Sequence, residues 1–423
     1  MNIFWFRRDL RLQDNHALLR SLENGPTLPV FIFDTKILNE LEKNDARVTF
    51  IYNSLKDIDQ QLRKYGSGLS VFIGDPISVF TLIFNENKPE AVYANEDYEP
   101  YAIIRDREVE KLAEKSGVKF LKWKDQVIFE KSEIMKSDGR PFQVFTPYKN
   151  KWLQRFMPSE FYKSEDKLEN IVRNNKPLPT IGELGFIESD IRVKPHCFTG
   201  LEKYQDVRDF PALESTSNAS VHLRFGTLSV REAVMSAMNI NPVLLSELIW
   251  REFFMQILYH FPYVENESFN PAFRNMAWLN DQEDFEKWKS GKTGFPMVDA
   301  GMRELNQTGY MHNRVRMVAA GFLCKHLLID WKWGERYFAA KLLDYDQAAN
   351  NGNWQWAAGT GCDAAPYFRI FNPVTQQEKF DKNFEYVKRW VPEYGTSDYP
   401  DPIIDHKLAR ERALSVFSKS LNK

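Results

Sequence analysis

The segment Pro29-Val-Phe-Ile-Phe33 is a continuous apolar run, and an amphipathic stretch at residues 47–65 follows it. Four similar runs recur in the first 125 residues, separated from one another by polar or amphipathic sequence. They lie at residues 3–6, 69–73, 91–94 and 119–123. Continuous apolar strands that alternate with helices are typical of a parallel sheet with helices on both faces. We therefore predict an α/β domain at residues 1–125, with a doubly wound parallel sheet of about five strands.

The rest of the chain has a different pattern. Six prolines interrupt polar sequence at residues 126–200, which predicts a long inter-domain connection with short helices. From residue 201 to residue 423 strand-like runs disappear and helical periodicity dominates. The helical patterns lie at residues 230–238, 244–259, 297–307, 313–328 and 334–343. We therefore predict that the second domain, residues 201–423, is all-helical.

The overall composition limits the partners and the compartment. Lys and Arg number 56 against 58 Asp and Glu, so the net charge is −2 and nucleic acid has to bind through a local basic patch. Three cysteines are too few for a disulfide framework and fit a reducing compartment. No targeting segment or membrane-spanning stretch is visible, so we expect a cytoplasmic protein. The seven histidines have no metal-ligand spacing, and we expect no metal site.

Tryptophan is unevenly distributed along the chain. Eight of the eleven tryptophans lie at or after Trp250. This half of the protein therefore either packs an unusually aromatic core or uses exposed aromatic faces for function.

Two short stretches in the helical half carry polar groups that have two possible uses. Residues 216–220, Thr-Ser-Asn-Ala-Ser, precede an amphipathic run, where their hydroxyls can cap the helix or hold a phosphate. Spacing alone favours capping. Glu247 and Trp250 are three residues apart on one helical face, with Arg251 adjoining. Spacing alone favours a solvated Glu247 over one that faces inward to serve a polar ligand.

The segment Met311-His-Asn-Arg-Val-Arg-Met places polar groups on more than one side of a helix. Asn313 and Met317 are four residues apart and share a face, whereas Arg314 points elsewhere, where it can meet an anion. Arg316 is predicted to pair with a carboxylate from a later segment, such as Asp344 or Asp346.

Residues 344–356 are the most unusual stretch. Two carboxylates, three asparagines and two tryptophans surround one glycine. Such a density of donors and acceptors suits recognition of a flat heterocycle with amide edges, and a capped loop between helices is the equal alternative.

These segments resemble the photolyase/cryptochrome family of FAD-dependent blue-light flavoproteins over nearly the whole chain. The opening Phe4-Trp-Phe-Arg-Arg-Asp-Leu-Arg-Leu-Gln-Asp-Asn is similar to the start of that family. The blocks that resemble its flavin domain are Gly294-Phe-Pro-Met-Val-Asp-Ala-Gly-Met-Arg-Glu-Leu, Met311-His-Asn-Arg-Val-Arg-Met and Asn350-Asn-Gly-Asn-Trp-Gln-Trp-Ala. Within the family, Met-His-Asn-Arg-x-Arg-Met resembles the class I photolyases, which act on cyclobutane pyrimidine dimers.

The resemblance implies an FAD site. Residues 216–220 would take the diphosphate, and Asp344 would pair with Arg316. Asn350 would face flavin N5, where Asn favours a reduced, anionic flavin. The positions that match FAD contacts are Tyr204, Thr216, Ser217, Asn218, Ala219, Ser220, Arg316, Asp344, Tyr345, Asp346 and Asn350.

The resemblance also implies an electron relay and a DNA pocket. Trp354, Trp331 and Trp278 match a three-indole relay between the protein surface and the flavin. The positions that match catalytic residues are Glu247, Asn313 and Asn350. The positions that match or adjoin lesion and DNA contacts are Arg208, Glu247, Trp250, Arg251, Asn313, Arg314, Met317, Trp356 and Arg369.

The activity that the resemblance implies is light-driven repair of cyclobutane pyrimidine dimers in UV-damaged DNA, by electron transfer from excited reduced FAD to a flipped-out dimer. We expect a monomer without membrane association or an obligate protein partner. The alternatives are a cryptochrome-like blue-light receptor without repair, which Asn350 disfavours, and a (6-4) photolyase, which Asn313 disfavours.

A second, light-harvesting chromophore is the least determined part of the resemblance. Members that hold a folate carry a Glu where this chain has Ala102, so the folate contact is not expected here. A deazaflavin, another flavin, a differently held folate and the absence of an antenna are the alternatives.

Overall fold

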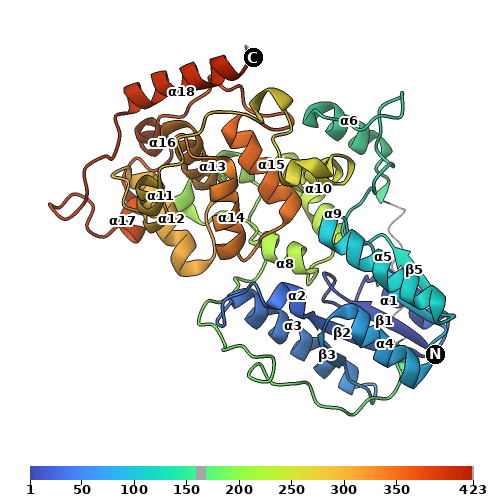
Figure 1. Cartoon of the computed structure of the whole chain (residues 1–423). Coiled ribbons are helices and arrows are strands. Elements are labelled where there is room, and N and C mark those ends of the chain that lie inside the picture. The colour runs from blue at the N-terminus through green and yellow to red at the C-terminus, as the bar shows by residue number, and fades with distance from the viewer. Residues whose placement is uncertain (159–167, 422–423) are drawn as a thin grey trace. The chain divides into compact units, whose positions relative to one another are not determined.

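The computed structural model describes residues 1–158 and 168–421, which form two compact units (Figure 1). The sheet unit comprises Met1–Glu133, Arg155–His196 and Asn218–Asn239. The helical unit comprises Ile134–Gln154, Cys197–Ser217 and Ile240–Lys423. The chain passes repeatedly between the units, and the domain ranges 1–125, 126–200 and 201–423 remain predictions. Residues 159–167 of the predicted connection, together with residues 422–423, lie outside the described residues.

The sheet unit contains a five-stranded parallel sheet with the strand order β3-β2-β1-β4-β5. The strands are β1 (Asn2–Phe6), β2 (Thr27–Asp34), β3 (Ser70–Gly74), β4 (Ala91–Asn95) and β5 (Lys119–Trp123). In the register of the sheet, Ile3 lies beside both Leu28 and Val92. Every position of β1 and β4 is buried, which explains why these runs are continuously apolar. All five predicted strands are present, so the α/β prediction is confirmed.

The helices of the sheet unit lie between the strands in sequence, apart from two that follow the last strand. They are α1 (His16–Glu23), α2 (Thr35–Leu38), α3 (Ala46–Arg63), α4 (Pro76–Asn87), α5 (Pro100–Lys115), α8 (Ala219–Phe225) and most of α9 (Val230–Ile240). On one face of the sheet Trp5 packs in the same core as Phe80 of α4 and Val109 of α5. Local sequence sets the helix starts: the Asp75 carboxylate accepts hydrogen bonds from the first backbone N–H groups of α4, and Pro76 follows it.

Every regular element in the described part of the helical unit is helical, as predicted. The α-helices are most of α6 (Phe145–Arg155), α7 (Tyr204–Val207), α10 (Pro242–His260), α11 (Gln282–Ser290), α12 (Pro296–Thr308), α13 (Asn313–Gly321), α14 (Trp331–Lys341), α15 (Gln347–Ala358), α16 (Pro373–Phe380), α17 (Glu385–Trp390) and α18 (His406–Leu421). The predicted single helix at residues 313–328 is wrong in one respect. It continues after α13 as a π-helical segment, η6 (Phe322–His326), in which the Leu327 N–H donates to the Phe322 carbonyl five residues earlier.

Two kinds of feature are absent from residues 1–158 and 168–421. No helix there is long and apolar enough to cross a membrane. No group of three His, Cys, Asp or Glu side chains in these ranges is arranged to hold a metal ion.

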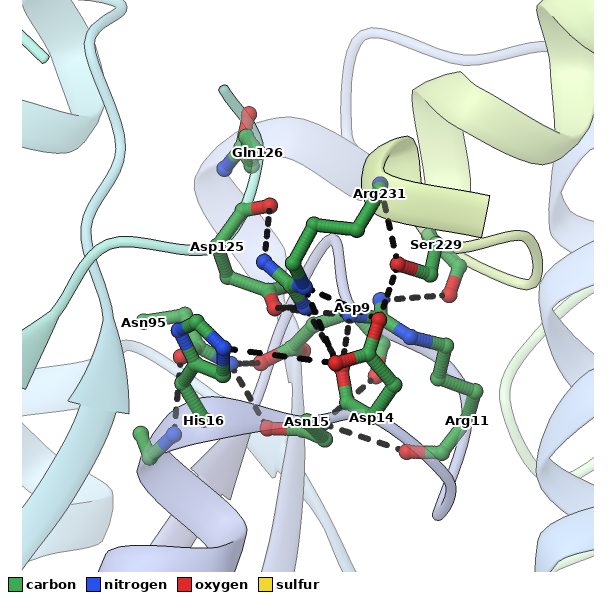
Figure 2. Close-up of polar contacts among 12 residues, drawn as sticks. Asp9, Arg11, Asp14, Asn15, His16, Asn95, Asp125, Gln126, Ser229 and Arg231 are labelled. Atoms are coloured by element: carbon green, nitrogen blue, oxygen red, sulfur yellow. Dashed lines mark hydrogen bonds and ion pairs between the residues drawn. The ribbon is translucent and has the colours of Figure 1, made fainter. Parts of the chain in front are cut away.

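A buried ion network lies within the sheet unit (Figure 2). Asp125, which is 2% exposed, accepts from Arg11 Nη2 at 2.6 Å and from Arg231 Nη2 at 2.7 Å. Arg231 also pairs through Nε with Asp14 at 2.9 Å. Burial by itself raises the pKa of Asp125, but the two guanidinium groups outweigh it and lower the pKa to about 2. The network joins α9 to residues that are more than 100 positions earlier in the chain.

We predict that Asp125→Asn destabilises the protein by about 3–5 kcal/mol, because it leaves two buried guanidinium groups without their carboxylate. Asp138→Asn is the matched control, since Asp138 is exposed and forms a surface ion pair with Arg140. The folded-state pKa of Asp125 lies below the unfolded value of about 3.9, so its contribution is present above pH 4 and is lost as the pH falls toward 2. Urea denaturation at pH 7 and pH 3 measures both effects. Equal stability of the two variants at pH 7 would contradict the prediction.

Candidate cofactor and nucleic-acid site

Helix α15 is held unusually close to its two neighbours by glycines. A Cβ atom on Gly352 of α15 would lie 2.1 Å from Phe254 of α10. A Cβ atom on Gly334 of α14 would lie 2.1 Å from Trp354 of α15. Neither glycine has a positive φ, so both are needed for space and not for backbone conformation. The close approach fixes the position of Asn350 and of the tryptophans that α15 carries.

Asn350 is buried and its orientation is set by α14. Its Nδ2 donates to Glu335 Oε1 at 2.8 Å and to the Glu335 backbone carbonyl at 3.1 Å. Burial raises the pKa of Glu335, and the hydrogen bond from Asn350 opposes this rise. Because the amide nitrogen is engaged twice, the amide oxygen is the end of Asn350 that remains for a ligand.

An ion pair links α13 to the segment before α15. Arg316 Nη2 lies 2.9 Å from Asp344 Oδ2, and Arg316 Nε donates to the Met311 carbonyl at 2.7 Å. The sequence left Asp344 and Asp346 as alternatives, and the structure places Asp344 in the pair. Asp346 is instead the N-cap of α15, where it accepts from the Ala349 N–H at 3.1 Å. Tyr345 between them is partly buried against the helical core.

A second polar group joins α7 to α10. Arg208 Nη1 lies 2.5 Å from Glu247 Oε1, and the Arg208 guanidinium stacks over the Tyr204 ring at 5.3 Å. Burial raises the pKa of the Tyr204 hydroxyl to about 12, and the Glu247 carboxylate adds to the rise. Glu247 is 35% exposed, so it is neither fully solvated nor fully buried. Tyr204, Arg208 and Glu247, predicted separately, therefore lie together.

Trp250 lies one helical turn after Glu247, and one face of its indole is covered. Its ring stacks on Phe145 of α6, with centroids 3.7 Å apart and an interplanar angle of 9°. Phe254 lies 5.4 Å away on the same helix. Trp250 is half-buried among these rings. Arg251 follows it and is half-buried.

The start of α13 brings together Asn313, Arg314 and Met317. Asn313 is exposed, and Met317 is half-buried one turn later. Arg314 Nη2 lies 2.7 Å from Asp209 Oδ2, and its guanidinium stacks over Phe380 at 4.3 Å. The anion that Arg314 meets in the structure is therefore a carboxylate of the protein itself.

His312 was not predicted from the sequence as a site residue. Its Nδ1 accepts from the Arg314 backbone N–H at 3.2 Å and caps α13. Burial lowers the pKa of His312 to about 4, so the ring is neutral and its proton is on Nε2. Nε2 is buried and has no hydrogen-bond partner among the described residues. Its sequence signal is only that it precedes Asn313.

The three predicted relay tryptophans belong to one aromatic core. Trp354 and Trp331 are fully buried and Trp278 is partly buried, as a path from the inside to the surface requires. Trp331 and Trp278 line one cavity of about 280 Å³. The ring neighbours of Trp354 are Phe338 at 4.9 Å and Trp288 at 6.1 Å. Trp356 packs against the same core.

The remaining predicted residues are spread over both units. Thr216 and Ser217 lie in the helical unit, whereas Asn218, Ala219 and Ser220 lie in the sheet unit at the start of α8. Asn218 is the N-cap of α8, but its side chain makes no cap hydrogen bond. In the helical unit Arg369 is exposed on the segment after α15. In the sheet unit Ala102 is buried in α5 and has no polar side-chain group to offer a folate.

The polar groups along α15 fit a flavin. A flavin ring has a flat apolar body and an edge of alternating N–H and carbonyl groups. Beside α15 the chain offers an oriented amide oxygen from Asn350, together with guanidinium N–H groups from the partly exposed Arg316. The same helix carries the partly buried indole of Trp356, which matches the apolar body.

Comparison with known proteins identifies the family. A model described as DNA photolyase matches residues 2–169, and a model described as the FAD binding domain of DNA photolyase matches residues 244–397. The deoxyribodipyrimidine photo-lyase of Halobacterium salinarum is 35% identical, with 99% of each chain covered. The chain therefore belongs to the DNA photolyase family, and it is an enzyme with an FAD-binding domain.

Solved structures support the same assignment. A bacterial class III photolyase from Agrobacterium tumefaciens has a TM-score of 0.89 at 34% identity, covering 100% of this chain and 98% of that one. An archaeal photolyase from Sulfolobus tokodaii with two FAD molecules has a TM-score of 0.88 at 37% identity, covering 99% and 100%. A Synechocystis cryptochrome has a TM-score of 0.84 at 25% identity, covering 98% and 99%. These proteins include a class III photolyase and a cryptochrome, so similarity alone does not set the lesion class.

We predict that Gly334→Ala destabilises the protein by about 1–3 kcal/mol, because its Cβ would overlap the Trp354 ring and push α15 from α14. It should also lower the FAD content of the purified protein. Gly321→Ala in α13 is the control, because nothing lies within 4 Å of its added Cβ. It should stabilise the protein by about 0.5–1 kcal/mol. Thermal denaturation and flavin absorbance measure both effects, and equal changes in the two variants would contradict the close packing of α15.

Proposed function

We propose that this protein repairs cyclobutane pyrimidine dimers in UV-damaged DNA with bound FAD and blue light. The observation that carries the proposal is that α13, with the exposed amide of Asn313, packs on α15, with the buried amide of Asn350. A flavin against Asn350 and a lesion against Asn313 would then be neighbours. The name of the 35% identical relative from Halobacterium salinarum supports the same activity.

The residues beside α15 would hold the flavin in its reduced state. Bound FAD supplies the light-driven electron transfer that opens the dimer and then takes the electron back. Asn350 presents an oxygen, because its nitrogen is held by Glu335, and an oxygen accepts from the N–H groups of a reduced flavin ring. Arg316 stays oriented by Asp344 and offers positive charge to the ring edge.

The lesion would be received between α10 and α13. A dimer has to leave the duplex to reach a buried flavin, and a damaged base pair costs less to open than an intact one. Trp356 and the half-buried Trp250 would stack on the dimer, at about 1–3 kcal/mol per base. The Glu247 carboxylate accepts hydrogen bonds from imide N–H groups, and Asn313 can both donate to and accept from the thymine edges.

Arginines around this pocket would hold the DNA backbone. Arg251, Arg314 and Arg369 are the proposed phosphate contacts, and Arg208 adjoins them through its pair with Glu247. Arg314 would have to exchange Asp209 for a phosphate. Its contribution to the DNA affinity is therefore smaller than that of an unpaired arginine. The predicted affinity is salt-dependent because these contacts release counterions.

The direct test is parallel illumination of two oligonucleotide duplexes, one with a cyclobutane thymine dimer and one with a (6-4) photoproduct. Chemically reduced protein should restore the first under blue light over many turnovers, should leave the second unchanged, and should act on neither in the dark. Chromatography of the digested DNA measures the products. Repair of the (6-4) lesion alone would replace the proposal with a (6-4) photolyase. Repair of neither would favour a light receptor.

For a second, light-harvesting chromophore we propose only its chemical class. The methyl group of Ala102 makes no hydrogen bond, so we propose that any antenna is a flavin or deazaflavin and not a folate held at this position. The Sulfolobus tokodaii photolyase, whose structure contains two FAD molecules, supports this choice. An absorption spectrum and flavin quantification of the purified protein test it.

We predict that Trp354→Phe slows photoreduction of the oxidised protein by more than about tenfold, because phenylalanine is much harder to oxidise than tryptophan. Repair by protein that has been chemically reduced beforehand should persist. Trp390→Phe, the same substitution at a partly buried core position outside the relay, is the control. Flavin absorbance during illumination is the readout. If Trp354→Phe abolishes repair by pre-reduced protein as well, the residue belongs to the pocket or the core and not to a relay.

A further inference from the structure

Lys325 is a buried cation of the helical unit that the proposed mechanism does not use. It lies in the π-helical segment η6 and is 2% exposed. Its Nζ donates to the backbone carbonyl of Arg369 at 3.1 Å. A Cβ atom on Gly359 would lie 3.6 Å from the same Nζ, so the ammonium also lies beside the C-terminal end of α15. An ammonium group has three donors, and within the described residues this one has a single hydrogen bond.

The surroundings of Lys325 do not neutralise its charge. Among the described residues no carboxylate forms an ion pair with it, and burial lowers the pKa of Lys325 to about 8. The Cys324 thiol raises this pKa and the Arg369 guanidinium lowers it. The nearby groups on α18 are His406, which hydrogen-bonds to His326, and Arg412, which donates to the His326 carbonyl. A buried, unpaired charge lowers the stability of the folded protein. Its presence therefore suggests that Lys325 has a functional role.

The ammonium acts in opposite directions on the two ends of Arg369. It attracts the backbone carbonyl of Arg369 inward, and it repels the guanidinium of the same residue. Arg369 is in fact exposed, and its guanidinium lies over Phe371 at 5.8 Å. The Arg369 N–H donates to the Pro366 carbonyl at 2.8 Å, which closes the turn that Lys325 holds.

We propose that Lys325 is a positioning residue that holds the Arg369 segment against the end of α15 and turns the Arg369 guanidinium outward to a DNA phosphate. This inference rests on the proposed function, because it requires DNA at the arginine rim. It adds a residue that touches neither DNA nor FAD and yet controls the DNA contact through its charge.

The inference gives the DNA affinity a defined pH dependence. As the pH rises through about 8, Lys325 loses its charge. The repulsion of the Arg369 guanidinium then disappears, and the hydrogen bond to the Arg369 carbonyl weakens because a neutral amine is a poorer donor. Affinity for DNA should therefore fall. Stability should change in the opposite direction: the unfolded lysine titrates near 10.4 and binds more protons between about pH 8 and 10, so folding becomes more favourable with pH there. Burial raises the pKa of Cys324 and Cys362 and lowers that of His326 and His406, which moves these groups out of the window.

The experiment measures the binding of the FAD-containing full chain to a duplex with one thymine dimer, at pH 7 and pH 9 and at several salt concentrations. For the wild type we expect the Kd to rise about fivefold between the two pH values. Lys325→Met should have the weaker Kd at both pH values and a salt slope smaller by about 1, as expected when one phosphate contact is lost. Lys388→Met, which removes an exposed lysine of α17, is the matched control and should behave like the wild type.

A double-mutant comparison separates positioning from general destabilisation. In an Arg369→Ala background, Lys325→Met should have no further effect on the Kd, because Lys325 acts through Arg369. Lys325→Arg keeps a charge at pH 9 and should flatten the pH dependence. If these variants fold poorly, as judged from their FAD content, the wild type provides the test. Its DNA affinity should fall with rising pH while its stability increases.

The possible failures are distinguishable. The role of Lys325 would be overturned if folded Lys325→Met bound DNA with unchanged affinity and salt slope. It would also be overturned if Lys325→Met weakened DNA binding as much in the Arg369→Ala background as in the wild type. Arg369→Ala with wild-type binding, or a wild-type Kd that is independent of pH, would overturn it as well. A wild type that does not prefer dimer-containing DNA to undamaged DNA would instead overturn the proposed function itself.

Discussion

The close approach of α15 to α10 and α14 is the constraint on which the site depends. It is possible only because Gly352 faces Phe254 and Gly334 faces Trp354, where a single methyl group would overlap an aromatic ring. At this separation Asn350 reaches both the side chain and the backbone carbonyl of Glu335. The Asn350 amide, which we propose faces a bound flavin, is thus oriented by packing before any ligand arrives, which is the arrangement that electrostatic catalysis requires.

Electrostatics in this protein is local and largely paired. The net charge of −2 gives no general attraction for DNA. Three arginines of the proposed flavin and DNA sites already have acidic partners: Arg208 with Glu247, Arg314 with Asp209 and Arg316 with Asp344. Such pairs fix side-chain positions and limit non-specific binding to nucleic acid, at the expense of affinity. The outward direction of Arg369 would then be set by the charge of Lys325, which has no acidic partner among the described residues.

The fold was predictable because burial leaves a direct trace in the sequence. The apolar runs of β1 and β4 are continuous since both faces of these strands are covered, and the helical periodicities end close to the observed helices. Spacing predicted that Arg316 pairs with a later carboxylate and left Asp344 and Asp346 open; the family resemblance pointed to Asp344, and the structure has this pair.

Other structural features, chiefly long-range side-chain contacts, leave no signal in the nearby sequence. Glu335 has the spacing of a solvated helical residue, and its bond to Asn350 exists only because α14 packs on α15. Lys325 interrupts an apolar run, which marks it as unusual but gives no partner 44 residues away. Within the sheet unit, the Arg231–Asp125 contact connects segments more than 100 residues apart, and it does not follow from composition.

The most direct test of this account is a crystal structure of the protein purified with its FAD. The account predicts that the flavin ring lies against α15, with the Asn350 amide oxygen within hydrogen-bond distance of its edge and the Asn350–Glu335 bond retained. A flavin bound away from α15, or an Asn350 that has turned its nitrogen to the ring and released Glu335, would contradict the central claim that α15 is the pre-oriented platform for the cofactor.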